Sequence, residues 1–230
     1  MAVFAIADFH LPGHNEKPMD VFGDHWQNHF DKIRMYWQEM IQPNDVVLIA
    51  GDISWAMQLE NALDDLLSIA SLNGRKVLIR GNHDYWWSSL KKIRACLPHE
   101  MYVLQNDALQ LDSYIISGAR GWYFPTETQS LSEEDTKIYQ RELIRLEMSL
   151  KEAQKLGGAQ FAMMHFPPLL SEGESTRFTD LLEQYGVQYV VYGHLHGIGI
   201  TSAFQGQKRG IEYRLTSCDA LNFCPVKICD

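Results

Sequence analysis

Short apolar runs rich in β-branched residues recur along the chain. Most are continuous, which is typical of central strands covered on both faces, whereas a half-exposed strand would alternate apolar and polar residues. They predict strands at residues 3–7, 46–50, 76–79, 114–117, 159–164 and 189–192.

Between these runs lie amphipathic segments that predict helices. The clearest covers residues 132–156, where Tyr139, Leu143, Leu146, Leu150 and Ala153 recur at steps of four and three and form one apolar stripe. Ser130 and Glu133 have the spacing of a capping box before it, and Gly157-Gly158 ends it. Shorter helices are predicted near residues 28–41, 55–72 and 176–185.

The last third changes character. Residues 199–204 and 211–218 are separated by the polar, glycine-containing segment 205–210, which predicts a hairpin. Helices alternating with strands early and hairpin strands late indicate a mixed sheet, or two sheets packed face to face with helices outside. No Pro/Gly/Ser-rich linker, run of like charges or internal repeat divides the chain, so we expect one domain over residues 1–230.

Candidate chemistry follows five of the predicted strands. Ligands tend to bind beyond the carboxyl ends of strands in such folds. If the backbone is extended there, residues two apart point to the same side, so Asp8 with His10 and His194 with His196 can each face one ion. The motifs are Asp8-Phe9-His10, Gly51-Asp52, Gly81-Asn82-His83-Asp84, His165 and Gly193-His194-Leu195-His196. Asp, His and Asn ligands without Cys suit Mn²⁺, Fe, Zn²⁺, Co²⁺ or Ni²⁺ more than Ca²⁺, and the sequence does not choose among these.

The order D-x-H, G-D, G-N-H-D/E, a lone His and G-H-x-H resembles that of the calcineurin-like metallophosphoesterases, over positions 8 to 196. The resemblance implies an α/β protein with mixed sheets, a four-layer αββα sandwich, and a centre of two divalent metal ions. It assigns Asp8, His10 and His196 to the first ion, and Asn82, His165 and His194 to the second, with Asp52 bridging the two. His83 would be the proton donor, and Asp84 would fix its tautomer and orientation.

Two such ions, about 3.5–4 Å apart, can share a hydroxide and hold the phosphate oxygens for in-line displacement. An imidazole titrates in the range needed to protonate the leaving group. The resemblance therefore implies hydrolysis of a small soluble phosphomonoester or phosphodiester, for which a nucleotide or cyclic nucleotide is one choice. The residues do not decide between monoester and diester. Alternatives are a non-catalytic metal-binding scaffold with the same fold, and a regulator that binds one metal ion.

Several residues admit two interpretations. Asp84 also suits the cap of a helix that begins near Tyr85. His14, in the loop after His10, can reach a substrate. Trp55 and Arg120 fall near predicted strand ends and can line the cleft, although core packing is the more usual role of a tryptophan. Arg120 can hold a second phosphate or a carboxylate through its guanidinium fork.

The amino-acid composition limits the kinds of partner that the protein can bind. A formal charge of −9 argues against binding of a nucleic acid polymer, which needs a basic face. The negative charge does not exclude phosphorylated small molecules as substrates, because bound divalent cations reverse the sign of the local electrostatic field. No apolar run approaches the roughly 18 to 20 residues that a membrane-spanning helix needs, and the first residues form a predicted strand without the basic start of a signal peptide.

The four cysteines do not suggest a disulfide framework. Cys224 and Cys229 have a spacing that can hold a zinc ion, although free thiols are the preferred interpretation. We therefore expect a cytoplasmic protein. The sequence does not indicate its oligomeric state.

Overall fold

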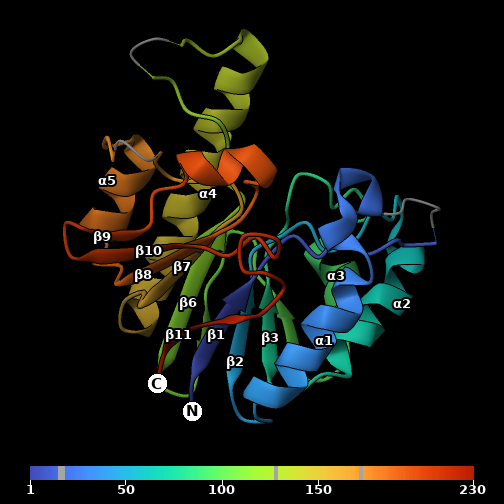
Figure 1. Cartoon of the computed structure of the whole chain (residues 1–230). Helices are drawn as coiled ribbons and strands as arrows, with labels where there is room; N and C mark the ends of the chain where they lie inside the picture. Colours follow the sequence, from blue (N-terminus) through green and yellow to red (C-terminus); the bar gives the residue numbers. More distant parts are fainter. Residues whose placement is uncertain (15–18, 127–128, 171–172) are drawn as a thin grey trace.

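The computed structural model describes residues 1–14, 19–126, 129–170 and 173–230, which form two mixed sheets flanked by helices (Figure 1). The first sheet has the strand order β11-β1-β2-β3-β4. Its parallel strands are β1 (Val3–Ile6), β2 (Val46–Ile49), β3 (Arg75–Leu78) and β4 (Met101–Val103). At its edge, β11 (Val226–Cys229) runs antiparallel to β1.

The second sheet has the strand order β5-β6-β7-β8-β10-β9. Its inner strands β6 (Tyr114–Ala119), β7 (Phe161–Met164), β8 (Tyr189–Tyr192) and β10 (Ile211–Leu215) are parallel. The edge strands β5 (Leu109–Leu111) and β9 (Gly206–Lys208) are antiparallel to their neighbours.

Three hydrophobic clusters separate four layers. On β1, Phe4 and Ile6 belong to a cluster with the helices of the first sheet, whereas Val3 and Ala5 belong to the cluster between the two sheets. The first outer layer contains α1 (His29–Met40), α2 (Leu59–Ala70) and α3 (Leu90–Cys96), and the other contains α4 (Glu133–Leu156) and α5 (Arg177–Gln184). Because every central strand is covered on both faces, the continuous apolar runs are explained and the αββα sandwich is confirmed.

The predicted central strands and the predicted helices are present, with ends that differ by a few residues. The sequence patterns missed β4, β5, β11 and α3, which have three, three, four and seven residues, too few to show a period. The cap of α4 is Ser132, whose hydroxyl accepts the N–H of Asp135 (3.0 Å), so the capping box predicted at Ser130 is wrong. Gly157 ends α4 as predicted, with φ 126°.

The predicted hairpin exists but is shifted. Residues predicted as its first strand form the 3₁₀ helix η3 (Gly197–Ser202), and β9 lies in the predicted loop. Arg209 and Gly210 join β9 to β10 with φ values of 49° and 82°. Two consecutive positive φ values are the signature of a type I′ turn, which needs only two residues between strands.

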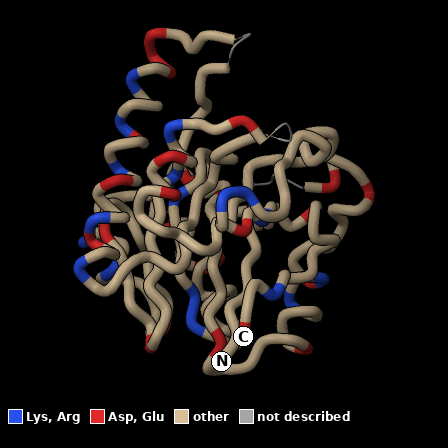
Figure 2. Tube along the Cα trace, turned by 90° about the vertical axis from the view of Figure 1, so that its left-hand side faces the viewer, with Lys and Arg blue, Asp and Glu red and all other residues tan. Residues whose placement is uncertain are grey.

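The carboxyl ends of β1, β2, β3, β7 and β8 lie at one end of the molecule, and both termini lie at the other (Figure 1). Backbone hydrogen bonds join the loops at the first end: Asp8 donates to Gly51 O (2.9 Å) and His10 donates to Asp52 O (3.0 Å). Among the described residues no helix is long and apolar enough to cross a membrane. Lys and Arg are interspersed with Asp and Glu along the face shown in Figure 2, without a continuous basic stretch.

Candidate metal centre

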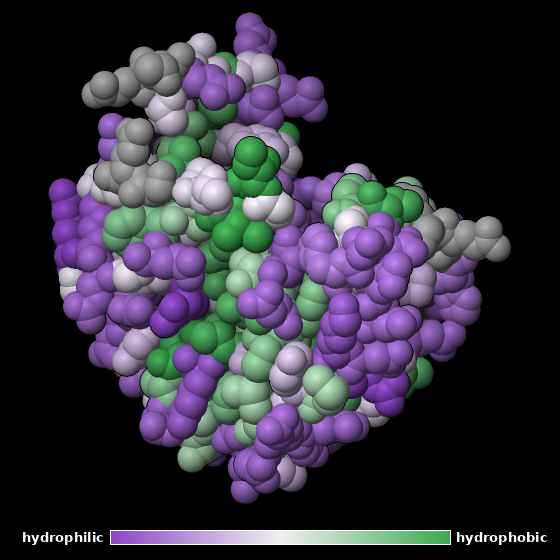
Figure 3. All heavy atoms as spheres, viewed as in Figure 1, coloured by the Kyte–Doolittle hydropathy of each residue, from purple (hydrophilic) through white to green (hydrophobic). Residues whose placement is uncertain are grey.

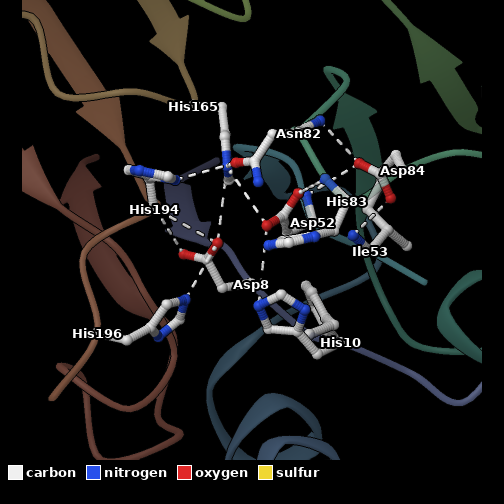
Figure 4. Close-up of polar contacts among 12 residues, drawn as sticks. Asp8, His10, Asp52, Ile53, Asn82, His83, Asp84, His165, His194 and His196 are labelled. Carbon is white, nitrogen blue, oxygen red and sulfur yellow. Dashed lines mark hydrogen bonds and ion pairs between the residues drawn. The ribbon is translucent and has the colours of Figure 1, made fainter. Parts of the chain in front are cut away.

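All seven predicted metal ligands converge at the carboxyl ends of the strands (Figure 4). Ligand atoms of Asp8, His10 and His196 lie within 4.8 Å of one another, and so do those of Asp8, Asp52 and His165. Asn82 and His194 complete the second group through contacts with His165 and with each other. The convergence of distant segments, on which the sequence interpretation depends, is therefore present.

The backbone that brings the ligands together is not the extended one expected. Asp8 and His10 have φ values of 62° and 47°, and Asp52 and His194 have 52° and 73°. Left-handed conformations are rare for residues with a Cβ and cost of order 1–3 kcal/mol each, so they persist only where surrounding contacts impose them. Four of them in one cluster indicate that the loops are shaped for the placement of these side chains.

His196 is held by a carboxylate that the sequence motifs did not include. Its Nδ1 lies 2.8 Å from Asp219 Oδ1, and the other Asp219 oxygen accepts the N–H of Gly197 (3.1 Å). This bond places the proton on Nδ1 and leaves the Nε2 lone pair directed at the cluster. Nε2 is buried without a hydrogen-bond partner among the described residues, and lies 3.5 Å from Asp8 Oδ1. The only sequence signal for Asp219 is its place shortly after β10.

The second group brings two imidazole nitrogens to one amide oxygen. His165 Nδ1 donates to Ala50 O (2.9 Å), so in the neutral ring Nε2 carries a lone pair. That Nε2 lies 2.7 Å from Asn82 Oδ1, and His194 Nδ1 lies 3.0 Å from the same oxygen. Each of these nitrogens can donate a proton to the amide oxygen or, with a cation present, direct its lone pair at the ion. The donor set therefore fits a divalent metal ion.

Asp52 occupies the position of a bridge. Its Oδ1 accepts the backbone N–H of His83 (2.8 Å). Its Oδ2 lies 3.4 Å from His165 Nε2 in the second group and 3.8 Å from His10 Nε2 in the first. One oxygen is therefore fixed by the backbone while the other faces both groups.

The electrostatics of the cluster favour added positive charge. Burial lowers the pKa of His10 and of His194 to about 4, so both rings are neutral at pH 7, as metal ligation requires. Burial also opposes protonation of His165 and His196, but the nearby carboxylates outweigh it and raise their pKa values to about 9 and about 10. Without a metal ion, protons on these rings compensate the buried carboxylates Asp8 and Asp52.

Asp84 has neither of its two predicted roles. Its buried carboxylate accepts the backbone N–H groups of Asp52, Ile53, Ser54 and Gly81, and the indole N–H of Trp86, at 2.7–3.2 Å. It makes no hydrogen bond with the His83 ring, whose Nδ1 has no partner among the described residues. The helix that follows is capped by Ser89 and not by Asp84. Asp84 instead ties the loop that carries Asp52 to the loop that carries Asn82.

The structure places one of the three predicted substrate residues in the cleft and the other two away from it. Trp55 stacks on the His10 ring (centroids 4.8 Å apart, 23° between planes) and lies 4.6 Å from the His83 ring, so it does line the cleft. His14 turns away, with Nε2 2.9 Å from Asp64 Oδ2 on α2. Arg120 is also wrong as a substrate residue: its guanidinium packs on Trp122 and lies 3.3 Å from buried Glu142. Its backbone oxygen does support the centre, by accepting the N–H of His165 (3.0 Å).

Two cavities that open from the cluster share none of their described lining residues, and a third, of about 480 Å³, shares His10, Met19 and Trp26 with the first of them. The His83 cavity, of about 320 Å³, includes His10, Phe22, Trp26, Trp55, His83 and His196. The His194 cavity, of about 490 Å³, includes Trp122, Tyr123, Phe124, Phe166, Leu170 and His194. Both volumes are in the range that holds a small-molecule group.

Comparison with known proteins gives a family match. The family model described as calcineurin-like phosphoesterase matches residues 1–197. No curated protein matches the chain.

Several solved structures resemble the chain, and two of them cover nearly all of it. One is the phosphopantetheinyl hydrolase PptH from Mycobacterium tuberculosis, with a TM-score of 0.56 and 12% identity over 99% of this chain and 95% of that one. The other is the protein of unknown function AQ665 from Aquifex aeolicus, with a TM-score of 0.49 and 13% identity over 98% of this chain and 95% of that one. At this identity, the match to PptH shows a shared fold.

Proposed function

The chain belongs to the calcineurin-like phosphoesterase family of metal-dependent phosphoester hydrolases, and we propose that it hydrolyses a small phosphoester at a centre of two divalent metal ions. One observation carries the proposal for this chain. Two imidazole nitrogens, His165 Nε2 and His194 Nδ1, lie 2.7 Å and 3.0 Å from Asn82 Oδ1, beside the buried carboxylates of Asp8 and Asp52, and this set of donor atoms suits a divalent cation.

The proposed ligands fall into the two groups described above. Asp8, His10 and His196 hold the first ion, Asn82, His165 and His194 hold the second, and Asp52 Oδ2 serves both. Two divalent ions supply Lewis-acid stabilisation of the phosphate oxygens and lower the pKa of a water molecule to the physiological range. The two ligand carboxylates only partly neutralise two dications, so the site attracts a phosphate anion despite the overall charge of −9.

His83 is the proposed proton donor to the leaving group. Its ring lines the His83 cavity, and its Nδ1 has no partner among the described residues. Burial lowers its pKa, and its backbone N–H is bound to Asp52 Oδ1, which fixes the start of the side chain beside the centre. Trp55 packs against the ring and limits its movement.

The chemistry of the donor atoms indicates a class of metal ions and not one particular metal. Imidazole and carboxylate ligands without thiolate suit Mn²⁺, Fe, Zn²⁺, Co²⁺ or Ni²⁺.

We further propose a single domain over residues 1–230 and a cytoplasmic location. The location is supported by four free cysteines, which are typical of a reducing compartment.

The test is a turnover assay on protein stripped of metal and reloaded with each of these ions. The substrates are phosphomonoesters and phosphodiesters, and they include a phosphopantetheinyl ester, the class named by the PptH neighbour. We expect hydrolysis that depends on added metal, two ions bound per chain, and loss of at least one ion in Asp52→Asn.

Two results would count against the proposal. Two bound ions without turnover of any phosphoester would support the scaffold alternative. Both ions retained in Asp52→Asn would contradict the bridging role.

A further inference from the structure

The shapes and linings of the two cavities restrict the substrate more than membership of the family does. Resting on the proposed function, we infer that the substrate is a phosphodiester with an uncharged apolar or aromatic group on each side of a single phosphate. The leaving group occupies the His83 cavity, and the second group occupies the His194 cavity.

The position of the leaving group follows from the position of the proton donor. A general acid must lie within hydrogen-bond reach of the oxygen that it protonates. His83 lines only the first cavity, whose walls also include Trp26, Trp55 and Phe22. The leaving group, which takes its proton from His83, therefore lies in the His83 cavity and is bordered by aromatic rings.

The second cavity has no use in hydrolysis of a monoester with its organic group in the first. It begins at the proposed ligand His194, which packs against Phe166 (ring centroids 4.0 Å apart) and lies 5.9 Å from Tyr123. The larger of the two cavities thus starts in contact with the metal centre. A second substituent on the same phosphorus atom is the group that it can accept.

The walls also define the chemical character of both groups. Neither cavity has a Lys or Arg among its described lining residues, and each has one carboxylate, Asp219 in the first and Asp135 in the second. A second phosphate in either cavity would have no Lys or Arg side chain among the described lining residues to pair with and would face a carboxylate. Arg120, the predicted holder of such a phosphate, is turned toward Glu142. Nucleoside diphosphates and other polyphosphates are therefore disfavoured.

Large side chains are exposed at both cavities, and apolar surface extends beyond the His83 cavity. Figure 3 shows hydrophobic patches over η3 and over the 3₁₀ helix η1 (Met19–Phe22), at the end of the molecule where the ligands converge. Phe22 and Tyr123, which line the first and second cavity respectively, are 64% and 52% exposed. Exposed aromatic side chains at a mouth cover apolar parts of a ligand and leave its charged phosphate to the metal centre.

The test measures binding and turnover with the Mn²⁺-loaded protein. Binding of methyl phenyl phosphate and diphenyl phosphate, both monoanions, is followed by calorimetry, so that the second ring is the only difference. We expect diphenyl phosphate to bind at least about tenfold more tightly, as burial of a second aromatic ring predicts. For turnover, kcat/KM should be higher for bis(4-nitrophenyl) phosphate than for 4-nitrophenyl phosphate.

Two substitutions of exposed side chains separate the cavities. Tyr123→Ala should weaken binding of diphenyl phosphate about three- to tenfold, the range for loss of an aromatic contact, and weaken binding of methyl phenyl phosphate less. Phe22→Ala should raise KM for both chromogenic substrates, because both place their leaving group in the His83 cavity. Ile144→Ala, at a 58% exposed position on α4 that lines neither cavity, is the matched control.

The outcomes distinguish this inference from the proposed function. Equal binding of the two diesters, or an equal effect of Tyr123→Ala on both, overturns the inference even if phosphoesters are hydrolysed. A preference for the monoester in kcat/KM does the same. Preferential binding of diphenyl phosphate that is lost in Tyr123→Ala, without turnover of any phosphoester, supports the binding arrangement and refutes the proposed activity.

Discussion

The Asp219 carboxylate lies 2.8 Å from His196 Nδ1, and its second oxygen accepts the N–H of the next residue, Gly197. This pair fixes both the tautomer and the direction of the His196 ring. Such outer carboxylates raise the basicity of a ligand imidazole, and their loss typically lowers metal affinity 10- to 100-fold.

We therefore predict that Asp219→Asn lowers the affinity for metal by about 10- to 100-fold, because the amide oxygen can keep the bond to His196 while the charge and the bond from the Gly197 N–H are lost. Asp219→Ala should lose more, since the ring is then free to rotate. Metal titration by calorimetry measures both. Asp31→Asn, on the exposed side of α1, is the control and should titrate like the unmodified protein. Unchanged affinity in Asp219→Ala would remove Asp219 from the site.

Asp84→Asn should destabilise the fold and weaken metal binding together. The new amide group would face backbone N–H groups that now donate to the carboxylate, at a cost of about 3 kcal/mol or more in the free energy of unfolding. The loops carrying Asp52 and Asn82 would also lose their link. Urea denaturation and metal titration measure the two effects.

Asp45 provides a matched control for Asp84. It too is buried and accepts backbone N–H groups, from Ala2 (2.7 Å) and Gln42 (2.9 Å), but at the other end of the first sheet. Asp45→Asn should lower stability without a change in metal affinity. If Asp84→Asn lowered kcat alone, with stability and metal content intact, the earlier expectation that Asp84 orients His83 would be restored.

His83→Ala should keep its full metal content but lower kcat by about 10²- to 10⁴-fold, the range for general acid catalysis. The loss should be smallest for 4-nitrophenyl esters, whose leaving group needs little protonation, and larger for alkyl esters. His99→Ala, on the exposed loop before β4, should leave both rates unchanged. Turnover at the original rate in His83→Ala, for both classes of ester, would refute its role.

Gly193→Ala tests the close approach of two loops. A Cβ at Gly193 would lie 2.6 Å from Asp8 Oδ2 and 2.8 Å from Ala7 Cβ, so the Asp8 carboxylate must move. We expect metal affinity to fall about tenfold or more, as when other groups that position ligands are altered. At Gly199 the nearest atom would be Leu195 Cδ2 at 3.8 Å, and Gly199→Ala should bind metal normally. Equal effects of the two substitutions would contradict the steric argument.

Lys76 predicts a pH dependence of stability away from the centre. Its buried ammonium group donates to Ala70 O (3.1 Å) and Leu72 O near the end of α2, and burial lowers its pKa to about 8. In the unfolded chain the pKa is about 10.4. Between these values the unfolded state binds more protons, so the free energy of unfolding rises with pH.

The measurement for Lys76 compares the unmodified protein with Lys76→Met, both free of metal, by urea denaturation at pH 7 and pH 9.5. The stability of the unmodified protein relative to the variant should increase between the two pH values. A difference that stays constant or decreases would show that the pKa is not lowered in the folded state.

Much of the fold and the ligand set could be predicted because both are recorded in local patterns. Each buried strand is a continuous apolar run, and each predicted ligand stands in a short motif directly after such a run. Strands of three residues such as β4 and β5 carry no period, and β9 lies in a polar stretch that resembles a loop. Those elements form because a neighbouring strand offers hydrogen bonds, which is information outside their own sequence.

The sequence by itself determined that this chain has the layered core and the seven proposed metal-ligand side chains, since hydrophobic burial and ligand chemistry depend on residue type and spacing. The tertiary structure alone decided how those side chains are held. It paired Asp219 with His196 across 23 positions, directed Asp84 to loop N–H groups about 30 positions away, turned Arg120 toward Glu142, and set Asp8 and His10 in left-handed conformations. Such contacts depend on which loops meet when two sheets pack, and no local pattern encodes that meeting.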